Sequence, residues 1–417
     1  MSVSVREKIK TGAAALLFLL SAFLSPGAAR ADFSDFFLVG DDIGSDKIPR
    51  FGSSRVLVVF AISDPSSAPT RLLDLFSLDA PGPTLRDYFR AASISQYDPK
   101  PEIVFVAAPS GVAPSGFPSF NEASPWRGFT KEILESLSSS GSFVPAEFDI
   151  NGAEGLPDGY LDGLIIIADG VEGAHAFPGG VLPGTIFGAV APGPFALAGP
   201  DASEFEILRA FARMLGFAPI PTGPDGRGGI VLSLMGAPDK GIPLIDGYSR
   251  LRAGWAKPVL VADPPRLFFL LPALDSGEIY ITGGAHEFFL VENRRPASGF
   301  DTALSGPGLA VFHIDETRLV PPGSEPPDGD PVWRPVIMNK WPDASYPLQK
   351  GIPASSDDAL FRDGAVFKSD YSAQNPLSDK RHPINSNYHG GEPSDFVIKD
   401  IDVSAHFPMI TVTLGME

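Results

Sequence analysis

Cysteine is absent from the 417 residues of the chain. A protein without a thiol forms no disulfide, builds no thiolate zinc site and has no cysteine nucleophile. Three other motifs are missing as well: the G-x-S-x-G nucleophile elbow, the phosphate-binding loop that ends in Lys and Ser or Thr, and the Rossmann glycine fingerprint. The sequence therefore carries no local signature of serine-hydrolase, P-loop or dinucleotide chemistry.

Basic residues are few, because 32 Lys and Arg stand against 50 Asp and Glu and the net charge is −18. Residues 1–31 hold four of the basic residues and one of the acidic ones, so the rest of the chain is more acidic still. An acidic surface without a basic stripe repels phosphate backbones. We expect no nucleic-acid partner.

Long apolar runs are confined to the beginning of the chain. A basic start at residues 6–10 precedes an apolar run at 13–24, and residues 29–31 read Ala-Arg-Ala, a small-x-small cleavage site. The run is shorter than the about 20 residues that cross a bilayer, which favours a cleaved signal peptide over a retained anchor. We predict cleavage after Ala31, a secreted or periplasmic protein, and no transmembrane segment in the remainder.

Glycine (44) and proline (43) are spread over the whole chain, which indicates many turns rather than one disordered tract. Three β-branched and aromatic runs predict buried strands at 55–62, 103–106 and 161–168. Two amphipathic segments predict helices at 85–94 and 129–137, and we interpret residues 172–200 as a Gly/Pro/Ala-rich loop. This alternation predicts an α/β (α+β) domain with a mixed twisted sheet over residues 32–261.

Helical periodicity becomes scarce after residue 262. Short apolar runs are separated by turns, at 267–271, 287–291, 309–314, 396–401 and 409–414. They predict a mostly antiparallel β domain over residues 262–417. The long segment 319–395, rich in Pro, Asp and Ser, has no pattern that predicts its structure.

One helix is clearly bounded in the sequence. Ser203 and Glu206 form an S-x-x-E capping box, and Gly216 and Pro219 mark the end of the helix. An apolar face at helical spacing consists of Phe205, Leu208, Phe211, Ala212 and Leu215.

Distinctive segments surround this helix, in a fixed order. They are Arg55–Phe60 followed by Ser63-Asp64, Asp87–Arg90 with Ser93, Asp149–Gly152, Asp158–Asp162, Ser233–Gly236, Gly254-Trp255, Glu287–Arg294 and Gly308–Glu316. Their order and spacing resemble the immune-inhibitor-A-like family of secreted bacterial zinc metallopeptidases. The resemblance covers about residues 55–315 and implies a zincin-like fold, with residues 203–217 as the active-site helix.

The chain departs from the family where the chemistry takes place. The family pattern is H-E-x-x-H-x-x-G-x-x-D, and the corresponding positions hold Arg209, Ala210, Arg213, Gly216 and Pro219. Both His ligands, the Glu that acts as general base and the third ligand are replaced, and a guanidinium offers no lone pair to a cation. We expect neither zinc nor zinc-dependent hydrolysis at this site.

Arg209 and Arg213 lie one turn apart on the predicted helix. One interpretation is a solvated face or pairing with nearby acids such as Glu206. The other is a clamp for an anion or carboxylate in the former cleft.

Four residues ahead of the strand at 161–168 suit a hard cation. Asp149, Asn151, Asp158 and Asp162 supply oxygen ligands from a glycine-containing turn, as calcium prefers. Their spacing departs from the D-x-[DN]-x-[DN]-G pattern. An ordinary Asx/Gly turn is the alternative to a calcium site.

The six histidines form no i,i+4 pair, so no second local zinc motif replaces the lost one. His389 with Glu392 and Asp395 is a weak loop cluster, and His313 beside Asp315 and Glu316 follows an apolar strand, which favours a structural role.

The sequence thus predicts a secreted, metallopeptidase-like protein without catalysis that binds a peptide or protein in or near the remnant cleft. Two alternatives stay open: a hydrolase with a non-standard site, such as the one at His389, and a calcium-stabilised surface or adhesion protein. The sequence does not address the oligomeric state.

Overall fold

The computed structural model describes residues 48–109, 113–114, 124–141, 143–151, 156–178, 187–220, 231–236, 238, 241–262, 264–284, 286–297, 299–320, 334–339, 359–363, 365–367, 394–403 and 408–417. The described residues form a mixed α/β protein with parallel and antiparallel strands. They belong to one compact unit. The predicted signal peptide lies outside the described residues.

A five-stranded sheet has the order β2-β1-β3-β5-β4. Its strands are β1 (Gly52–Ile62), β2 (Tyr97–Ala107), β3 (Leu164–Ala168), β4 (Ala174–Phe177) and β5 (Phe195–Ala198). The first four in this order run parallel, and β4 is antiparallel to β5 at the edge. Residues 56–62 of β1 are buried, because β1 has neighbours on both sides and helices on both faces; a continuous apolar run is typical of such a strand.

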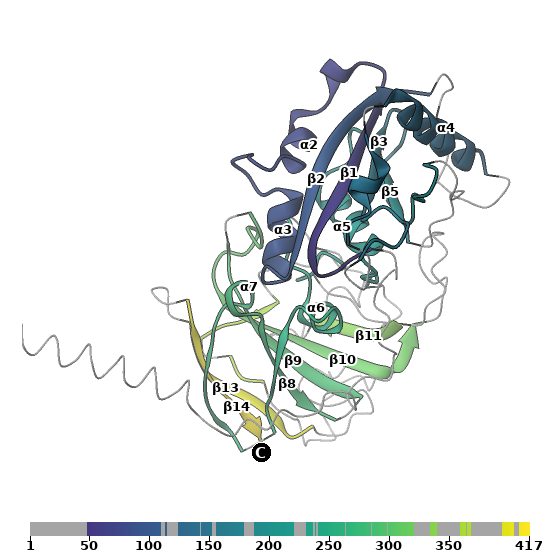
Figure 1. Cartoon of the computed structure of the whole chain (residues 1–417). Coiled ribbons are helices and arrows are strands. Elements are labelled where there is room, and N and C mark those ends of the chain that lie inside the picture. Colours follow the sequence, from purple (N-terminus) through teal and green to yellow (C-terminus); the bar gives the residue numbers. More distant parts are fainter. Residues whose placement is uncertain are drawn as a thin grey trace, which may run out of the picture. The chain divides into compact units, whose positions relative to one another are not determined.

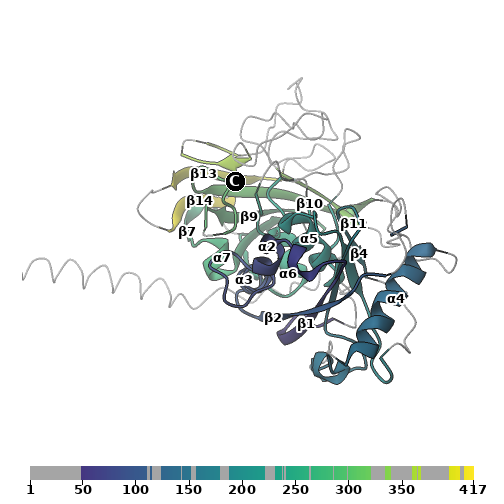
Figure 2. The ribbon, with the colours of Figure 1, turned by 90° about the horizontal axis from the view of Figure 1, so that it is seen from above.

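Helices cover the two faces of this sheet. Helix α4 (Pro125–Ser140) packs Trp126, Ile133 and Leu137 against the face formed by Leu57 and Val59. Helices α2 (Thr70–Leu75), α3 (Leu85–Ala92) and α5 (Glu204–Met214) contribute to the opposite face. In Figures 1 and 2, β1 and β2 separate α4 from α2 and α3.

The predicted strands at 55–62, 103–106 and 161–168 and the two predicted helices all overlap elements of the structure. The prediction of a loop over residues 172–200 was wrong, because this segment contains β4 and β5. Both strands have only four residues, lack β-branched side chains and are half alanine, so local propensity gave no indication of them. Their pairing with β3 and with each other holds them in the sheet.

A second sheet has the order β11-β10-β9-β8-β6. It contains β6 (Lys257–Leu260), β8 (Glu278–Gly283), β9 (Glu287–Arg294), β10 (Gly308–Val320) and β11 (Arg334–Asn339), and β12 (Leu360–Phe361) pairs with β10. Only the β6–β8 pair is parallel among the named strands of this sheet. The short helices α6 (Gly247–Arg252) and α7 (Ala273–Ser276) both contact β9.

Three further strands, β7 (Arg266–Leu270), β13 (Phe396–Val403) and β14 (Ile410–Met416), form an antiparallel sheet in the order β13-β14-β7. They lie next to one another in Figure 2. All five apolar runs predicted beyond residue 262 overlap strands, namely β7, β9, β10, β13 and β14. The division of the chain at residues 261 and 262 stays a prediction.

Two 3-10 turns, η2 (Pro65–Ser67) and η3 (Pro145–Phe148), complete the described elements. None of the helices in the described part of the chain is both long and apolar enough to cross a membrane.

Candidate functional site

Helix α5 has the cap that its sequence predicts. The Ser203 hydroxyl accepts a hydrogen bond from the backbone N–H of Glu206 at 3.3 Å, and the Glu206 carboxylate accepts one from the backbone N–H of Ser203 at 2.8 Å. This reciprocal pair satisfies two amides that the first turn leaves unbonded. Gly216, two residues past the last helical residue, has φ +92°, a left-handed conformation that favours glycine.

The four residues singled out in the sequence have different environments: three lie on α5, and Pro219 lies beyond its end. Ala210 and Pro219 are buried, whereas Arg209 and Arg213 are half-buried. Phe211 lies two positions from each arginine, about 200° around the helix, so both arginines occupy the side opposite Phe211. The Phe211 ring packs edge-on against Phe89 of α3, with centroids 5.0 Å apart. The two guanidinium groups therefore lie on the side of α5 that faces away from this aromatic contact.

A tight turn at residues 233–236 lies next to the arginines of α5. Arg209 Nη2 donates to the carbonyl oxygen of Met235 at 3.5 Å, and the N–H of Ile220 donates to the same oxygen at 2.7 Å. The turn is closed by Ser233, whose hydroxyl accepts from the N–H of Met235 at 3.1 Å. Met235 itself is fully buried. These bonds connect the turn to the chain that leaves α5.

Asp246 caps α6 and fixes the same turn. Its carboxylate accepts from the Ser233 hydroxyl at 2.8 Å, from the Ser249 N–H at 2.8 Å and from the Ser249 hydroxyl at 2.9 Å. Burial raises the pKa of Asp246, because a charged carboxylate loses its hydration there. Three hydrogen bonds to the ionised form oppose that increase.

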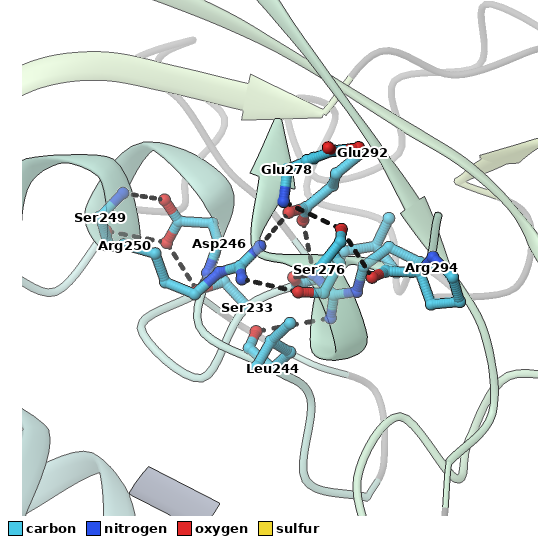
Figure 3. Close-up of polar contacts among 12 residues, drawn as sticks. Ser233, Leu244, Asp246, Ser249, Arg250, Ser276, Glu278, Glu292 and Arg294 are labelled. Carbon is cyan, nitrogen blue, oxygen red and sulfur yellow. Dashed lines mark hydrogen bonds and ion pairs between the residues drawn. The ribbon is translucent and has the colours of Figure 1, made fainter. Parts of the chain in front are cut away.

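A buried network of charged side chains lies next to α6 and includes Arg250, Glu292 and Arg294 (Figure 3). Arg250 Nη2 meets Glu292 Oε2 at 2.5 Å, and Arg294 Nη1 meets the other oxygen of Glu292 at 2.9 Å. Arg294 also binds both oxygens of Asp301, at 2.7 and 2.6 Å. It donates further to the carbonyl of Leu232 at 2.9 Å. The network thereby connects α6, β9 and the residue that precedes the turn at 233–236.

Every charged group of this network is enclosed, since the four side chains of Arg250, Glu292, Arg294 and Asp301 are almost completely buried. Removing one partner from such a buried pair costs about 3–5 kcal/mol, because the remaining charge is left unpaired away from water. The sequence contained an indication of this role, namely Glu292 and Arg294 at the end of an otherwise apolar run. Their partners Arg250 and Asp301 could not be identified without the tertiary structure.

The carboxylates among the four candidate calcium ligands accept backbone hydrogen bonds. The Asp149 carboxylate accepts from the N–H groups of Asp158 and Gly159 at 2.9 and 3.0 Å. Asp162 accepts from the backbone N–H groups of Arg55, Ile150 and Asn151 at 3.1–3.2 Å. The Asp158 carboxylate accepts from the N–H of Tyr160 two residues on at 3.0 Å, as in an Asx turn. The Asn151 amide donates to backbone oxygens of Phe51 and Ser53.

Burial raises the pKa of Asp162 to about 6, although the backbone hydrogen bonds act in the opposite direction. Neighbouring Asp149 adds to the increase, because like charges disfavour ionisation. Within the described residues, no group of three or more His, Cys, Asp or Glu side chains is arranged to hold a metal ion.

The three histidines among the described residues, His175, His286 and His313, have separate partners. His313 is fully buried on β10; its Nε2 lies 2.9 Å from Glu287 Oε1 and its ring stacks on Phe289 at 4.5 Å. His286 Nδ1 lies 4.0 Å from Glu316 Oε2. Of the predicted cluster at His389, only Asp395 belongs to the described residues, so this prediction lies outside them.

Strand β4 is the edge strand of the five-stranded sheet, which the sequence did not indicate, and among the described residues it pairs with β5 alone. Gly199 N–H donates to the Gly173 carbonyl at 2.9 Å, so this opposing pair is hydrogen-bonded. Hydrogen-bonded and non-hydrogen-bonded pairs alternate in an antiparallel ladder, so the backbone N–H and C=O groups of Ala174 and Ala176 point away from β5. Ala176 is only 1% exposed, so this side of β4 is covered at that residue.

Alanines allow α5 to approach this edge. Ala174 and Ala176 of β4 pair with Ala198 and Ala196 of β5, so all four small side chains share one sheet face. Ile165 of β3 pairs with Ala196 on that face, which is the face that α5 covers.

A scan of the chain against protein-family models gave no match, and a search among curated proteins gave no significant match.

Proposed function

We propose that this chain is a secreted, metallopeptidase-like protein without peptidase activity, and that it binds a peptide or protein in or near the remnant cleft beside α5. The observation that carries the proposal is the preservation of α5, with its capping box and its buried apolar face, while its ligand positions hold Arg209, Ala210 and Arg213. The family is the immune-inhibitor-A-like metallopeptidases, on the resemblance of the sequence segments.

The arrangement of elements supports a zincin-like fold. Four parallel strands are followed at one edge by the antiparallel strand β4, and α5 packs beneath β4 and β5. The turn that holds Met235 contacts Arg209, at the position expected for a turn beneath the former metal site.

The residues of α5 argue against catalysis. A zinc peptidase needs neutral imidazole nitrogens to hold the metal and a carboxylate to activate its water. Guanidinium groups stay protonated and donate hydrogen bonds only, and the methyl group of Ala210 cannot accept a proton. Pro219 likewise supplies no ligand atom from its side chain.

Secretion is part of the proposal, on the basis of the signal-like segment that ends at Ala31. N-terminal sequencing of the protein from culture supernatant and periplasm tests it. A first residue at Asp32 is the expected result, and an intact Met1 in a membrane fraction would overturn it.

Zinc content and proteolysis test the absence of catalysis. Mass spectrometry of the purified protein should find no stoichiometric zinc, and casein hydrolysis should be absent with and without chelator. Stoichiometric zinc together with chelator-sensitive cleavage would contradict the proposal. Chelator-insensitive cleavage that Ser, His or Asp variants outside α5 abolish would favour a hydrolase of another kind.

Peptide binding beside α5 is tested by fluorescence anisotropy with labelled octapeptides, and circular dichroism checks the fold. We expect the double variant Arg209→Ala with Arg213→Ala to change the binding. Arg266→Ala, at an exposed position of β7, is the matched control and should leave it unchanged. Binding that the double variant leaves unchanged would exclude this side of α5 as the peptide site.

A further inference from the structure

We infer that a water molecule is bound between helix α4 and the five-stranded sheet, where it accepts a hydrogen bond from Trp126 and forms a second one with Thr130. The inference is independent of the proposed function, because α4 and α5 cover opposite faces of this sheet. Its basis is the burial, the position and the chemistry of these two side chains.

Burial leaves one polar atom of each side chain unsatisfied. Trp126 is 3% exposed and Thr130 is fully buried. Within the part of the chain that the structure describes, neither the indole Nε1 of Trp126 nor the hydroxyl Oγ1 of Thr130 has a hydrogen-bond partner. A polar group that is buried without a partner loses its hydration and gains nothing in return. Native proteins therefore supply a partner, and buried water commonly serves where no protein group does.

The two side chains lie on the same side of α4. They are four residues apart in the helix, so their Cβ atoms are about 6 Å apart, one turn above the other. Ile133 and Leu137 continue this side of the helix and pack against the sheet. A water molecule that forms two hydrogen bonds of about 2.9 Å bridges polar atoms up to about 6 Å apart. One water molecule therefore suits the spacing of Trp126 and Thr130.

The direction of α4 places this pair at one end of the sheet. The helix is followed by η3, where the Phe148 carbonyl accepts a hydrogen bond from the N–H of Asp162, just ahead of β3. The last turn of α4 therefore lies near the beginning of the parallel strands, and its first turns lie near their ends. Ala61 of β1 and Ala168 of β3 are the residues that face α4 at those ends, and they pair with each other.

The small side chains of Ala61 and Ala168 provide room under the first turns of α4. Two residues further back on the same face, the corresponding pair is Val59 and Ile166, which fill more of the space between helix and sheet. A water molecule needs a volume of only about 30 Å³. The exchange of branched side chains for alanine at the end of the sheet therefore provides space beside the Trp126 ring.

The chemistry of the two groups identifies the occupant. An indole N–H only donates a hydrogen bond, whereas a hydroxyl group donates and accepts. The occupant must therefore accept from Trp126 and can form either kind of bond with Thr130. Both side chains are neutral and the residues that α4 packs against are apolar, so an ion would lose its hydration without a counter-charge. Water is small and neutral and has both capacities.

Magnetic cross-relaxation between water and indole protons tests the inference directly. In the full chain with isotope-labelled tryptophan, the Nε1–H of Trp126 should show a cross-peak to a water molecule of long residence time. Trp126→Phe assigns the signal. Trp255 is the matched control, because it is also buried but its Nε1–H donates to the Arg50 carbonyl at 2.9 Å, so we expect no such cross-peak there. A Trp126 indole without the cross-peak would overturn the inference.

Thr130→Val tests the bridge, because valine keeps the shape of threonine and removes the hydroxyl. The equilibrium constant of unfolding should increase about five- to tenfold, and the cross-peak at Trp126 should weaken or vanish. Thr70→Val, at an exposed position of α2, is the matched control and should change the constant about twofold or less. Unchanged or greater stability of Thr130→Val would overturn the inference, since removal of an unsatisfied hydroxyl does not destabilise a protein.

The double variant Trp126→Phe with Thr130→Val tests whether one water molecule serves both side chains. The first substitution already removes the bridge, so the double variant should be destabilised by clearly less than the two single effects combined. Independent effects would contradict a shared water molecule. Coupling without the water cross-peak would mean that the two side chains bond directly, and would also overturn the inference. Circular dichroism checks that each variant retains the fold.

Discussion

Two groups of arginines in this protein differ in how far the fold encloses them. Arg250 and Arg294 are fully buried, and each binds the carboxylate of Glu292. Arg209 and Arg213 are half-buried on one helix and keep part of their surface in solvent. Enclosed charges must be neutralised within the fold, so the first group holds the structure together. Partly exposed charges retain solvation, so the second group can change without destroying the fold and can contact a ligand.

The strongest test of this comparison is the removal of the shared anion in Glu292→Ala. Arg250 would lose its buried carboxylate partner, and Arg294 would retain one carboxylate partner, Asp301. The free energy of unfolding should fall by about 3–5 kcal/mol. Urea denaturation followed by circular dichroism measures it. Glu135→Gln, at an exposed i,i+4 pair with Lys131, is the control and should cost about 0.5 kcal/mol or less. Equal effects would contradict the structural role of the network.

A pH titration gives the next largest effect and concerns Asp162. Burial raises the pKa of this carboxyl to about 6, whereas in an unfolded chain it stays near its ordinary value of 3.8. Between these values the folded state binds a proton that the unfolded state has released. The contribution of Asp162 to stability should therefore increase as the pH falls from about 6 to about 4.

Unfolding free energies at pH 4.5 and pH 6.5 measure this contribution, with Asp162→Asn as the reference that cannot titrate. When the pH falls from 6.5 to 4.5, the free energy of unfolding of the native protein should increase relative to that of Asp162→Asn. An unchanged difference would mean that Asp162 titrates alike in the folded and unfolded states.

The smallest effect on stability is expected for Arg209→Ala and Arg213→Ala. Neither arginine pairs with Glu292, and we expect each substitution to change the free energy of unfolding by about 0.5 kcal/mol or less. The same urea titrations measure this, and the peptide titrations measure the accompanying loss of binding. A loss of unfolding free energy near that of Glu292→Ala would show that Arg209 and Arg213 stabilise the fold as Arg250 does, and would contradict the difference between the two groups of arginines.

Prediction from sequence succeeded where local chemistry decides the structure. The cap of α5 follows from Ser203 and Glu206, and its end from Gly216, because these residues act on the backbone next to them. The buried strand β1 follows from its continuous apolar run. Strand β4 could not be predicted, because a four-residue segment rich in alanine gains its stability only from its neighbour β5. Arg250, the partner of Glu292 on α6, lies 42 residues before it in sequence, and Asp301, the partner of Arg294, lies 7 residues after Arg294, so no local pattern relates these residues.

The sequence by itself determined which chemistry α5 can offer. Side-chain identity alone decides that Arg209, Ala210, Arg213 and Pro219 supply neither imidazole ligands nor a carboxylate base. The tertiary structure decided what lies beside that helix: the alanine-rich strands β4 and β5, and a turn fixed by a buried network of charges. Pairing across a sheet and neutralisation of buried charges depend on distances between remote segments, and only the folded chain sets those distances.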